Sequence, residues 1–419
     1  MAKEYRDAQR VRLEEKPCVV KYLEEFDQFV IGTYELIPLF QAAVDKNVSQ
    51  QQWEEVNHRL GSLIVFGPAT CGSERQTKFH EVCRIACSEG GGIFDMALKF
   101  DESIASYTLF AAHSNGSIGF YGVHQSPTTL KAIRKPLRIC DSKMLTCVDH
   151  FKLSDPKTVA SLAEELLFLG DSEGFITVRE PKNELILARL NVSSGSEIWQ
   201  VKSLWCNTDW CFVLIASENS SWYIYKFCLL AKELKLIYKN LSQDFAAGVT
   251  CITLPQRIIS AQGKVAKFDV ILGSYDETLK IFNVYLEETT SDEQLRVECK
   301  SKCSIKDGGI WRAKIVGQQE TKQSQCNPTQ TEAKKTLLVA AMYAGTYSIN
   351  LNYSNANELS LEDKLPTRFD FTYEDDGDES SIFKLSEEPL HYDIDVSLKS
   401  DICCIADFNN HLCMFVPRP

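Results

Sequence analysis

The sequence predicts an all-β protein, a seven-bladed β-propeller of the WD-repeat type, and three observations predict it. A unit of a buried strand, a polar turn and a half-exposed strand recurs about seven times, and strand-rich repeats of about 40 or more residues indicate a propeller. A further strand candidate precedes each unit, and another follows most of them. The last unit lacks this outer strand, and the N-terminal segment 10–15 (RVRLEE) is available to replace it.

The stretch ILGSYDETLKIFNV (271–284) illustrates the unit, because an apolar run ends at Gly273 and alternation resumes after a polar turn. Small residues tend to end the first strand, where we expect another backbone to approach closely. A two-sheet sandwich is the structural alternative, but it gives no reason for the repeated order. The other units are, in chain order, 29–36 continued by GSLIVF, 109–123, 166–181, 212–227, 337–351 and 402–416.

The flanking strands complete each predicted blade. Those before the units would line the central channel, and those after them would form the outer rim. A strand from the opposite terminus would remove the free edges of the ring. The predicted inner strands are 18–25, 92–100, 144–153, 197–205, 248–254, 308–315 and 391–398, and the outer strands are 80–87, 137–140, 185–192, 234–241, 295–302 and 367–374.

Three insertions interrupt the predicted repeat. Residues 37–59 look partly helical, residues 317–335 are polar without apolar periodicity, and residues 353–387 contain the acidic block YEDDGDESS. The acidic block is interpreted as a solvated loop or as a contact for a basic partner. Because propellers grow by repetition, one domain spanning 1–419 is expected.

Composition limits the function. The formal net charge of −12 argues against a nucleic-acid-binding body. The 16 cysteines are scattered, without zinc-ligand spacing, and are expected to be buried reduced thiols, so we expect no metal or cofactor. No apolar run approaches the roughly 20 residues of a membrane span, and MAKEYRDAQR lacks a signal-peptide core. A cytoplasmic monomer is therefore expected.

Several of these segments, in order, resemble the WD-repeat diphthine methylesterase family of the diphthamide pathway. The most specific matches are the Gly-Ser-Tyr-Asp turn in ILGSYDETLKIFNV and the Gly-Gly-x-Trp-Arg strand in GGIWRAKI (308–315). The chain departs from the family pattern at ASENSS (216–221), at 392–396 and at Phe245. Further matches are FVIGTYEL, GSLIVF, GIFDMALKF, AAHSNGSIGFY, EIWQVKSLW, LLVAAMYAGTYSI and ICCIADFNNHLCMF.

The resemblance implies hydrolysis of the methyl ester of diphthine, which is built on a histidine of translation elongation factor 2. The elongation factor would be the partner, with no direct contact to nucleic acid. Because the substrate carries a trimethylammonium group, its pocket would use aromatic faces and carboxylates. The candidate substrate-binding residues are Glu197, Trp199, Tyr275, Asp276, Trp311 and Asp395, with Tyr343 as a further aromatic residue near a blade rim.

Ester hydrolysis needs a nucleophile or activated water, a base and an oxyanion stabiliser. The candidate catalytic residues are His391 and His113 as bases and Arg312 for the oxyanion. Strand alternation predicts that either Arg312 or its neighbour Trp311 faces the channel while the other lies between blades. Ser274 as nucleophile lacks an identified base.

No G-x-S-x-G elbow and no H-E-x-x-H motif is present. Structural roles for both histidines, for Asp276 and for Arg312 therefore remain open. A non-catalytic WD-repeat scaffold is the alternative function, because this is the commoner role of the fold and no complete catalytic constellation is recognisable.

Overall fold

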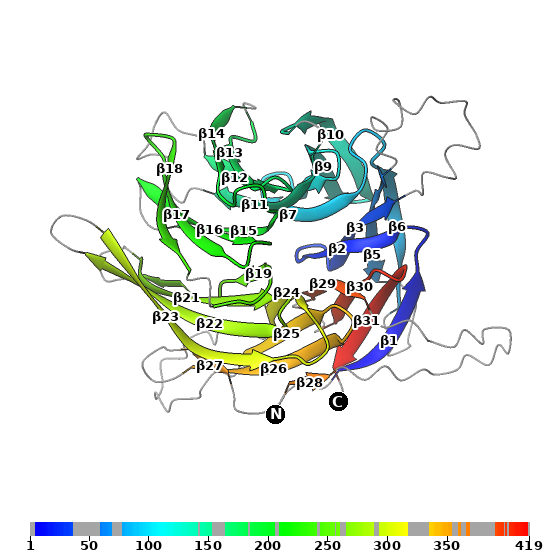
Figure 1. Ribbon diagram of the computed structural model, residues 1–419. Helices are drawn as coiled ribbons and strands as arrows, with labels where there is room; N and C mark the ends of the chain where they lie inside the picture. Colours follow the sequence, from blue (N-terminus) through cyan, green and yellow to red (C-terminus); the bar gives the residue numbers. More distant parts are fainter. Residues whose placement is uncertain are drawn as a thin grey trace, which may run out of the picture.

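Seven antiparallel β-sheets stand around a central channel in the computed structural model, which confirms the predicted seven-bladed β-propeller (Figure 1). The described residues form strands and turns without any helix. These residues are 5–36, 59–68, 78–140, 143–152, 164–182, 185–205, 209–240, 244–255, 257–259, 265–288, 293–316, 335–353, 359–361, 366–368, 390–397, 399 and 402–417.

Each sheet runs from an innermost strand at the channel to an outermost strand at the rim (Figure 1). The first three sheets are β2 (Lys16–Leu23), β3 (Gln28–Leu36), β5 (Ser62–Pro68) and β6 (Phe79–Ala86); β7 (Ile93–Asp101), β8 (Ser106–His113), β9 (Ser117–Gln125) and β10 (Thr128–Arg138); and β11 (Leu145–Lys152), β12 (Glu165–Asp171), β13 (Phe175–Arg179) and β14 (Ile186–Asn191). The next three are β15 (Ile198–Trp205), β16 (Trp210–Ser217), β17 (Trp222–Cys228) and β18 (Glu233–Lys239); β19 (Val249–Thr253), β21 (Val265–Ser274), β22 (Thr278–Glu288) and β23 (Glu293–Ser304); and β24 (Ile310–Val316), β25 (Lys335–Ala341), β26 (Gly345–Tyr353) and β27 (Leu359–Leu361). The seventh is β29 (His391–Val396), β30 (Cys403–Asp407), β31 (His411–Pro417) and β1 (Tyr5–Arg12), and the short strands β4 (Arg59–Leu60), β20 (Arg257–Ile259) and β28 (Thr367–Arg368) pair at the margins of the first, fifth and sixth sheets.

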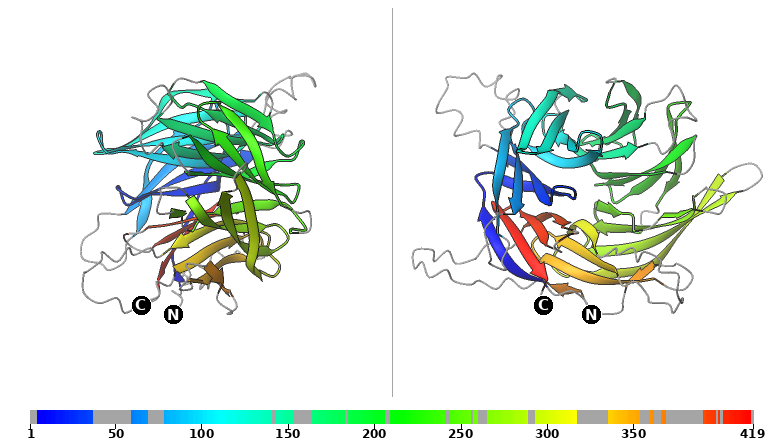
Figure 2. Two further views of the ribbon diagram at one scale, coloured as in Figure 1. Left: turned by 90° about the vertical axis from the view of Figure 1, so that its left-hand side faces the viewer. Right: turned by 180° about the vertical axis from the view of Figure 1, so that it is seen from behind.

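The N-terminal strand closes the ring, as predicted. Strand β1 pairs antiparallel with β31 and is the outermost strand of the seventh sheet; Figure 2 shows the two side by side from behind. The strand spans residues 5–12 rather than the predicted 10–15. It ends at Arg12 because its partner His411 is the first residue of β31, and beyond it the Leu13 N–H donates to the Asn410 carbonyl in the preceding turn (2.8 Å).

Two predicted outer strands differ from the structure. In the second sheet β10 begins at Thr128, well before the predicted 137–140, because it pairs along the whole of β9. In the sixth sheet β27 and β28 pair separately with β26, and only residues 367–368 of the predicted 367–374 are described as a strand. Insertions 37–59 and 317–335 lie outside the described residues except at their last positions, as does most of 353–387.

All seven innermost strands contain the same irregularity near their first residue. In each, one residue is skipped in the pairing with the second strand, as in a β-bulge, which re-aims a side chain and increases the local twist. We call these seven the bulge residues: Cys18, Phe94, Thr146, Trp199, Thr250, Trp311 and Tyr392.

In the second strand of each sheet, a small residue pairs with the residue that follows the bulge residue. In three sheets this residue is glycine, and in four it is alanine. A Cβ atom added to Gly170 would lie 2.6 Å from Ile198 Cγ2 of the next blade and 2.6 Å from Cys147 Sγ. The predicted close approach is therefore present, but a side chain of the neighbouring blade makes it rather than a backbone.

The hydrophobic core is divided into layers between neighbouring sheets. The layer between the fourth and fifth sheets contains the fully buried Trp222 and Phe212, whose rings lie 5.3 Å from Phe282 and 5.4 Å from Phe268. Apolar residues of the first and seventh sheets share another layer, so the closed ring leaves no uncovered face there. All thirteen described cysteines are free thiols and nine of them are buried, in line with the sequence-based expectation.

Candidate functional site

Aromatic side chains gather at the end of the channel where the innermost strands begin. Their ring centroids form a continuous series: Trp199–Trp311 (5.1 Å), Trp311–Tyr275 (5.5 Å), Trp311–Tyr392 (5.2 Å), Tyr392–Phe408 (4.5 Å), Phe408–Tyr34 (6.5 Å) and Tyr34–Phe94 (5.0 Å). We call these seven residues the aromatic arc. Trp199 and Trp311 belong to the fourth and sixth blades, so their rings meet over the start of the fifth.

The bulges explain why these side chains converge. Four members of the arc are bulge residues, and the other three come from the second strand or from the turn that follows it. Glycines before the innermost strands leave room for them: a Cβ atom at Gly309 would lie 3.0 Å from Tyr275 Cδ1, and one at Gly92 would overlap the ring of Tyr34.

A carboxylate adjoins one end of the arc. The Trp199 indole N–H donates to Glu218 Oε2 (2.5 Å), and Glu218 is half-buried in the turn between β16 and β17. Burial raises the pKa of Tyr275 and of Tyr392 well above the usual range, so both phenols stay protonated at neutral pH. The arc is therefore a mostly apolar, electron-rich surface with an acidic group beside it.

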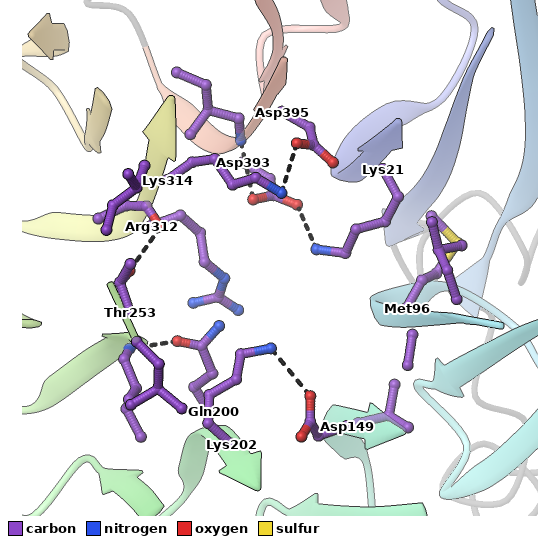
Figure 3. Close-up of a pocket in the computed structure, with 18 of the residues that line it drawn as sticks. Lys21, Met96, Asp149, Gln200, Lys202, Thr253, Arg312, Lys314, Asp393 and Asp395 are labelled. Carbon is purple, nitrogen blue, oxygen red and sulfur yellow. Dashed lines mark hydrogen bonds and ion pairs between the residues drawn. The ribbon is translucent and has the colours of Figure 1, made fainter. Parts of the chain in front are cut away.

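A cavity of about 510 Å³ occupies the channel beside the arc (Figure 3). Arg312 connects the aromatic arc with the cavity. It follows Trp311 on β24, and its guanidinium carbon lies 4.9 Å from the centre of the Trp311 indole. Other polar residues that line the cavity are Lys21, Asp149, His150, Gln200, Lys202, Thr253, Lys314, Asp393 and Asp395.

The cavity carboxylates tie neighbouring blades together. Asp393 Oδ2 accepts from the Val20 N–H (3.0 Å), and Asp395 Oδ2 accepts from the Tyr22 N–H (2.8 Å). Asp395 also pairs with Lys314 (2.8 Å). Asp395, predicted to bind substrate, is thus a link among the sixth, seventh and first blades.

The structure does not bring the two predicted catalytic histidines to the cavity. His113 and His391 are fully buried between strands, and neither lines the cavity. His113 Nε2 lies 3.0 Å from the Tyr121 hydroxyl, and His391 Nδ1 lies 2.7 Å from the Thr346 hydroxyl. Burial lowers the pKa of each to about 4. Both imidazoles are enclosed by packing, and their role as catalytic base stays a prediction.

Arg312 does lie at the cavity. Its Nη1 donates to the carbonyls of Thr250 (3.0 Å) and Trp311 (2.9 Å). The prediction that one of Trp311 and Arg312 faces the channel rests on strict alternation, which the bulge at Trp311 interrupts. Trp311 joins the arc and Arg312 the cavity.

The remaining predicted residues occupy the rim of the arc. Asp276 closes its own turn, since Oδ1 accepts from the Thr278 N–H (3.0 Å) and Oδ2 accepts from the Ala246 N–H (2.7 Å). Glu197 is half-buried, and its carbonyl accepts from the Glu218 N–H (2.9 Å). Tyr343 is 51 % exposed in the turn after β25.

Sequence reasoning missed Glu218, most of the cavity residues, and the arc members Tyr34, Phe94, Tyr392 and Phe408. A signal existed for two of the aromatic residues. Aligned at the bulge, the innermost strands read Ile-Phe-Asp, Ile-Trp-Gln, Ile-Trp-Arg and His-Tyr-Asp, with the aromatic residue at one repeated position.

These features define a WD40-type β-propeller with an aromatic channel mouth. A solved structure with this fold is "Crystal structure of RRP9 WD40 repeats", which is 9 % identical, with a TM-score of 0.53, and covers 100 % of this chain and 99 % of that one. At this identity the likeness shows the fold alone. No family model matches the sequence, and neither does any curated protein.

The described residues lack two further features. They contain no helix that is long and apolar enough to cross a membrane. Within the same part of the chain, no three His, Cys, Asp or Glu side chains are grouped so as to hold a metal ion.

Proposed function

We propose that the protein hydrolyses the methyl ester of diphthine on elongation factor 2, acting as a cytoplasmic monomer. The observation that carries the proposal is the aromatic arc with Glu218 beside it. A fixed trimethylammonium group is attracted to the faces of tryptophan and tyrosine, and a nearby carboxylate adds to the attraction. The ordered resemblance through GSYDETLK and GGIWR supports the same substrate.

The proposed reaction uses groups at the junction of arc and cavity. The trimethylammonium group docks on Trp199, Trp311 and Tyr275, and the ester carbonyl lies toward Arg312. Glu218 accepts a proton from water as that water attacks the carbonyl carbon, and the Arg312 guanidinium stabilises the oxyanion. The bond from carbon to methoxy oxygen then breaks, the proton passes to that oxygen, and methanol leaves.

The test uses elongation factor 2 isolated from cells that lack this protein, so that the methyl ester is retained. Purified protein, without added metal or cofactor, is expected to lower the mass of the modified histidine by one methylene and to release methanol. Trp199→Ala is expected to raise KM about 2- to 30-fold, which corresponds to about 0.5–2 kcal/mol for a cation on an aromatic face. Trp199→Phe should retain most of the affinity.

Glu218→Gln tests the proposed base, and Glu233→Gln on the exposed outer strand of the same blade is the matched control. Loss of the base is expected to lower kcat about 10²- to 10⁴-fold, while the control stays near wild type. Unchanged kcat in Glu218→Gln would remove this residue from the mechanism. If wild-type protein leaves the ester intact, the esterase proposal itself fails.

A non-catalytic scaffold is the second candidate, and the burial of His113 and His391 favours it. In that case the arc would bind the modified loop, or another partner, without chemistry. Binding of the elongation factor with no change in its mass would support this candidate over the first.

A further inference from the structure

The cavity collects positive charges from three blades. Lys21 comes from the first blade, Lys202 from the fourth, and Arg312 and Lys314 from the sixth. In Figure 3 the side chains of Lys21, Lys202 and Arg312 extend from different strands toward the same space. Three carboxylates also line the cavity, so their arrangement decides what the space can hold.

Each lysine has a carboxylate partner on the wall. Lys21 Nζ lies 3.4 Å from Asp393 Oδ2 and 3.7 Å from Asp95 Oδ1, and Lys202 Nζ lies 3.2 Å from Asp149 Oδ1. Those carboxylates are also engaged by the backbone: Asp149 Oδ2, for example, accepts from the Ser203 N–H (2.8 Å). An ammonium group has three N–H donors, so Lys202 keeps donors for a further acceptor after its ion pair, and Lys21 keeps one after its two.

Arg312 has no such carboxylate. It is 7 % exposed, and among the described residues it takes part in no ion pair; its Nη1 donates to two carbonyls instead. A buried cation without a counter-ion is costly, and a guanidinium has five N–H donors. The remaining donors of Arg312 therefore suit an acceptor inside the cavity.

Arg312 and Lys21 act on each other across this space. Burial lowers the pKa of Lys21 and Arg312 lowers it further, but Asp393, Asp95 and Asp395 raise it, and the net pKa lies above the usual value. Lys21 is thus a cation at neutral pH. Because carboxylates already outweigh the effect of Arg312 at Lys21, a bound anion would gain most from Arg312, which has no carboxylate partner among the described residues.

We propose that the channel cavity binds a small organic polyanion bearing phosphate or carboxylate groups, with Arg312, Lys21 and Lys202 as its partners. Gln200 would add a donor, because its Oε1 accepts from the Ile252 N–H while the side chain lines the cavity. A cavity of about 510 Å³ exceeds the needs of a single phosphate and matches common small-molecule sites. This inference shares Arg312 with the proposed ester hydrolysis, but that reaction needs no such ligand, so each can fail without the other.

Isothermal titration with pyrophosphate and with citrate, at matched ionic strength in sodium chloride, tests the site. Wild-type protein is expected to bind one anion saturably. Lys202→Gln is expected to weaken binding about ten-fold or more, since a charge-assisted hydrogen bond is lost. Lys235→Gln, the same change on the exposed outer strand of the same blade, should bind like wild type.

Arg312→Gln is expected to abolish binding, but it also removes bonds to two carbonyls, so its melting temperature must be measured alongside. The deciding comparison is therefore the affinity of Lys202→Gln against that of Lys235→Gln. The proposal is overturned if wild-type protein shows no saturable binding, or if Lys202→Gln and Lys235→Gln bind equally. Tighter binding of a tetraglutamate peptide than of either free anion would also overturn it, by assigning the cavity to an acidic segment of a partner protein.

Discussion

Gln9 on the closing strand β1 makes a contact between the seventh and first blades, so its substitution tests how the closed ring is stabilised. Its Nε2 donates to the Phe79 carbonyl (2.6 Å), and its Oε1 accepts from the Phe79 N–H (2.7 Å). Phe79 begins β6 of the first blade and pairs there with Pro68, which has no N–H to donate. The Gln9 amide therefore gives the Phe79 carbonyl the hydrogen bond that Pro68 cannot donate, and it joins the seventh blade to the first.

Gln9→Ala removes both hydrogen bonds. Each is worth about 0.5–1.5 kcal/mol, so the free energy of unfolding should fall by about 1–3 kcal/mol. The upper part of this range applies because Phe79 is buried and its polar groups are left unpaired. Such a loss is a substantial part of the roughly 5–15 kcal/mol that holds a native protein.

Urea unfolding followed by tryptophan fluorescence measures the change, with Gln125→Ala at an exposed position of β9 as the control. Hydrogen exchange should also speed up in β1 and β31 and at the start of β6. If Gln9→Ala and its control agree within about 0.5 kcal/mol, the amide does not hold the ring closed.

Three further outcomes are expected. Gly170→Ala should lower the free energy of unfolding by about 1–3 kcal/mol in urea titrations, because the new methyl group overlaps Ile198; an unchanged midpoint would show that the blades shift freely. The pKa of His391 is about 4 in the folded protein and about 6.5 when unfolded, so only the unfolded chain gains a proton between these values. Stability should therefore fall as pH drops from about 6.5 to about 4; His391 contributes about 1.4 kcal/mol per pH unit to this slope, and His391→Asn should remove that contribution while the similar contribution of His113 stays. Among the described cysteines, iodoacetamide should label the exposed Cys299 of the native protein first, and earlier labelling of the buried Cys404 in mass spectrometry would contradict the packing.

The sequence predicted the ring because its signal is local and repeated. Alternation and polar turns marked the strands of every blade, and the missing outer strand after β31 pointed to the N-terminus. The predicted strand boundaries were wrong where pairing with a neighbouring strand determines them. Strands β1 and β10 extend along β31 and β9, and no pattern within 128–136 indicated the pairing of β10.

The site was harder to predict, because it depends on contacts between blades. Strict alternation does not hold at Trp311, since a bulge adds one residue to the strand there. His113 and His391 looked reactive in the sequence, yet whether an imidazole is enclosed depends on residues that pack over it from elsewhere, such as Gly90 over His113. Glu218 carried no signal of its own, because only its contact with Trp199 gives it a place in the site.

The seven bulge residues serve two different purposes around the ring. Each blade offers one side chain at the same height around the mouth, and in this chain the set comprises two tryptophans, one tyrosine, one phenylalanine, two threonines and one cysteine. Thr146 and Thr250 are buried and donate hydrogen bonds to the Ile198 and Ile310 carbonyls of the next blade, so these two bulge residues help to hold the blades together. Phe94, Trp199 and Tyr392 are partly exposed members of the aromatic arc, so exchanging one of them would change the surface of the channel mouth while the strand pairing around it stays in place.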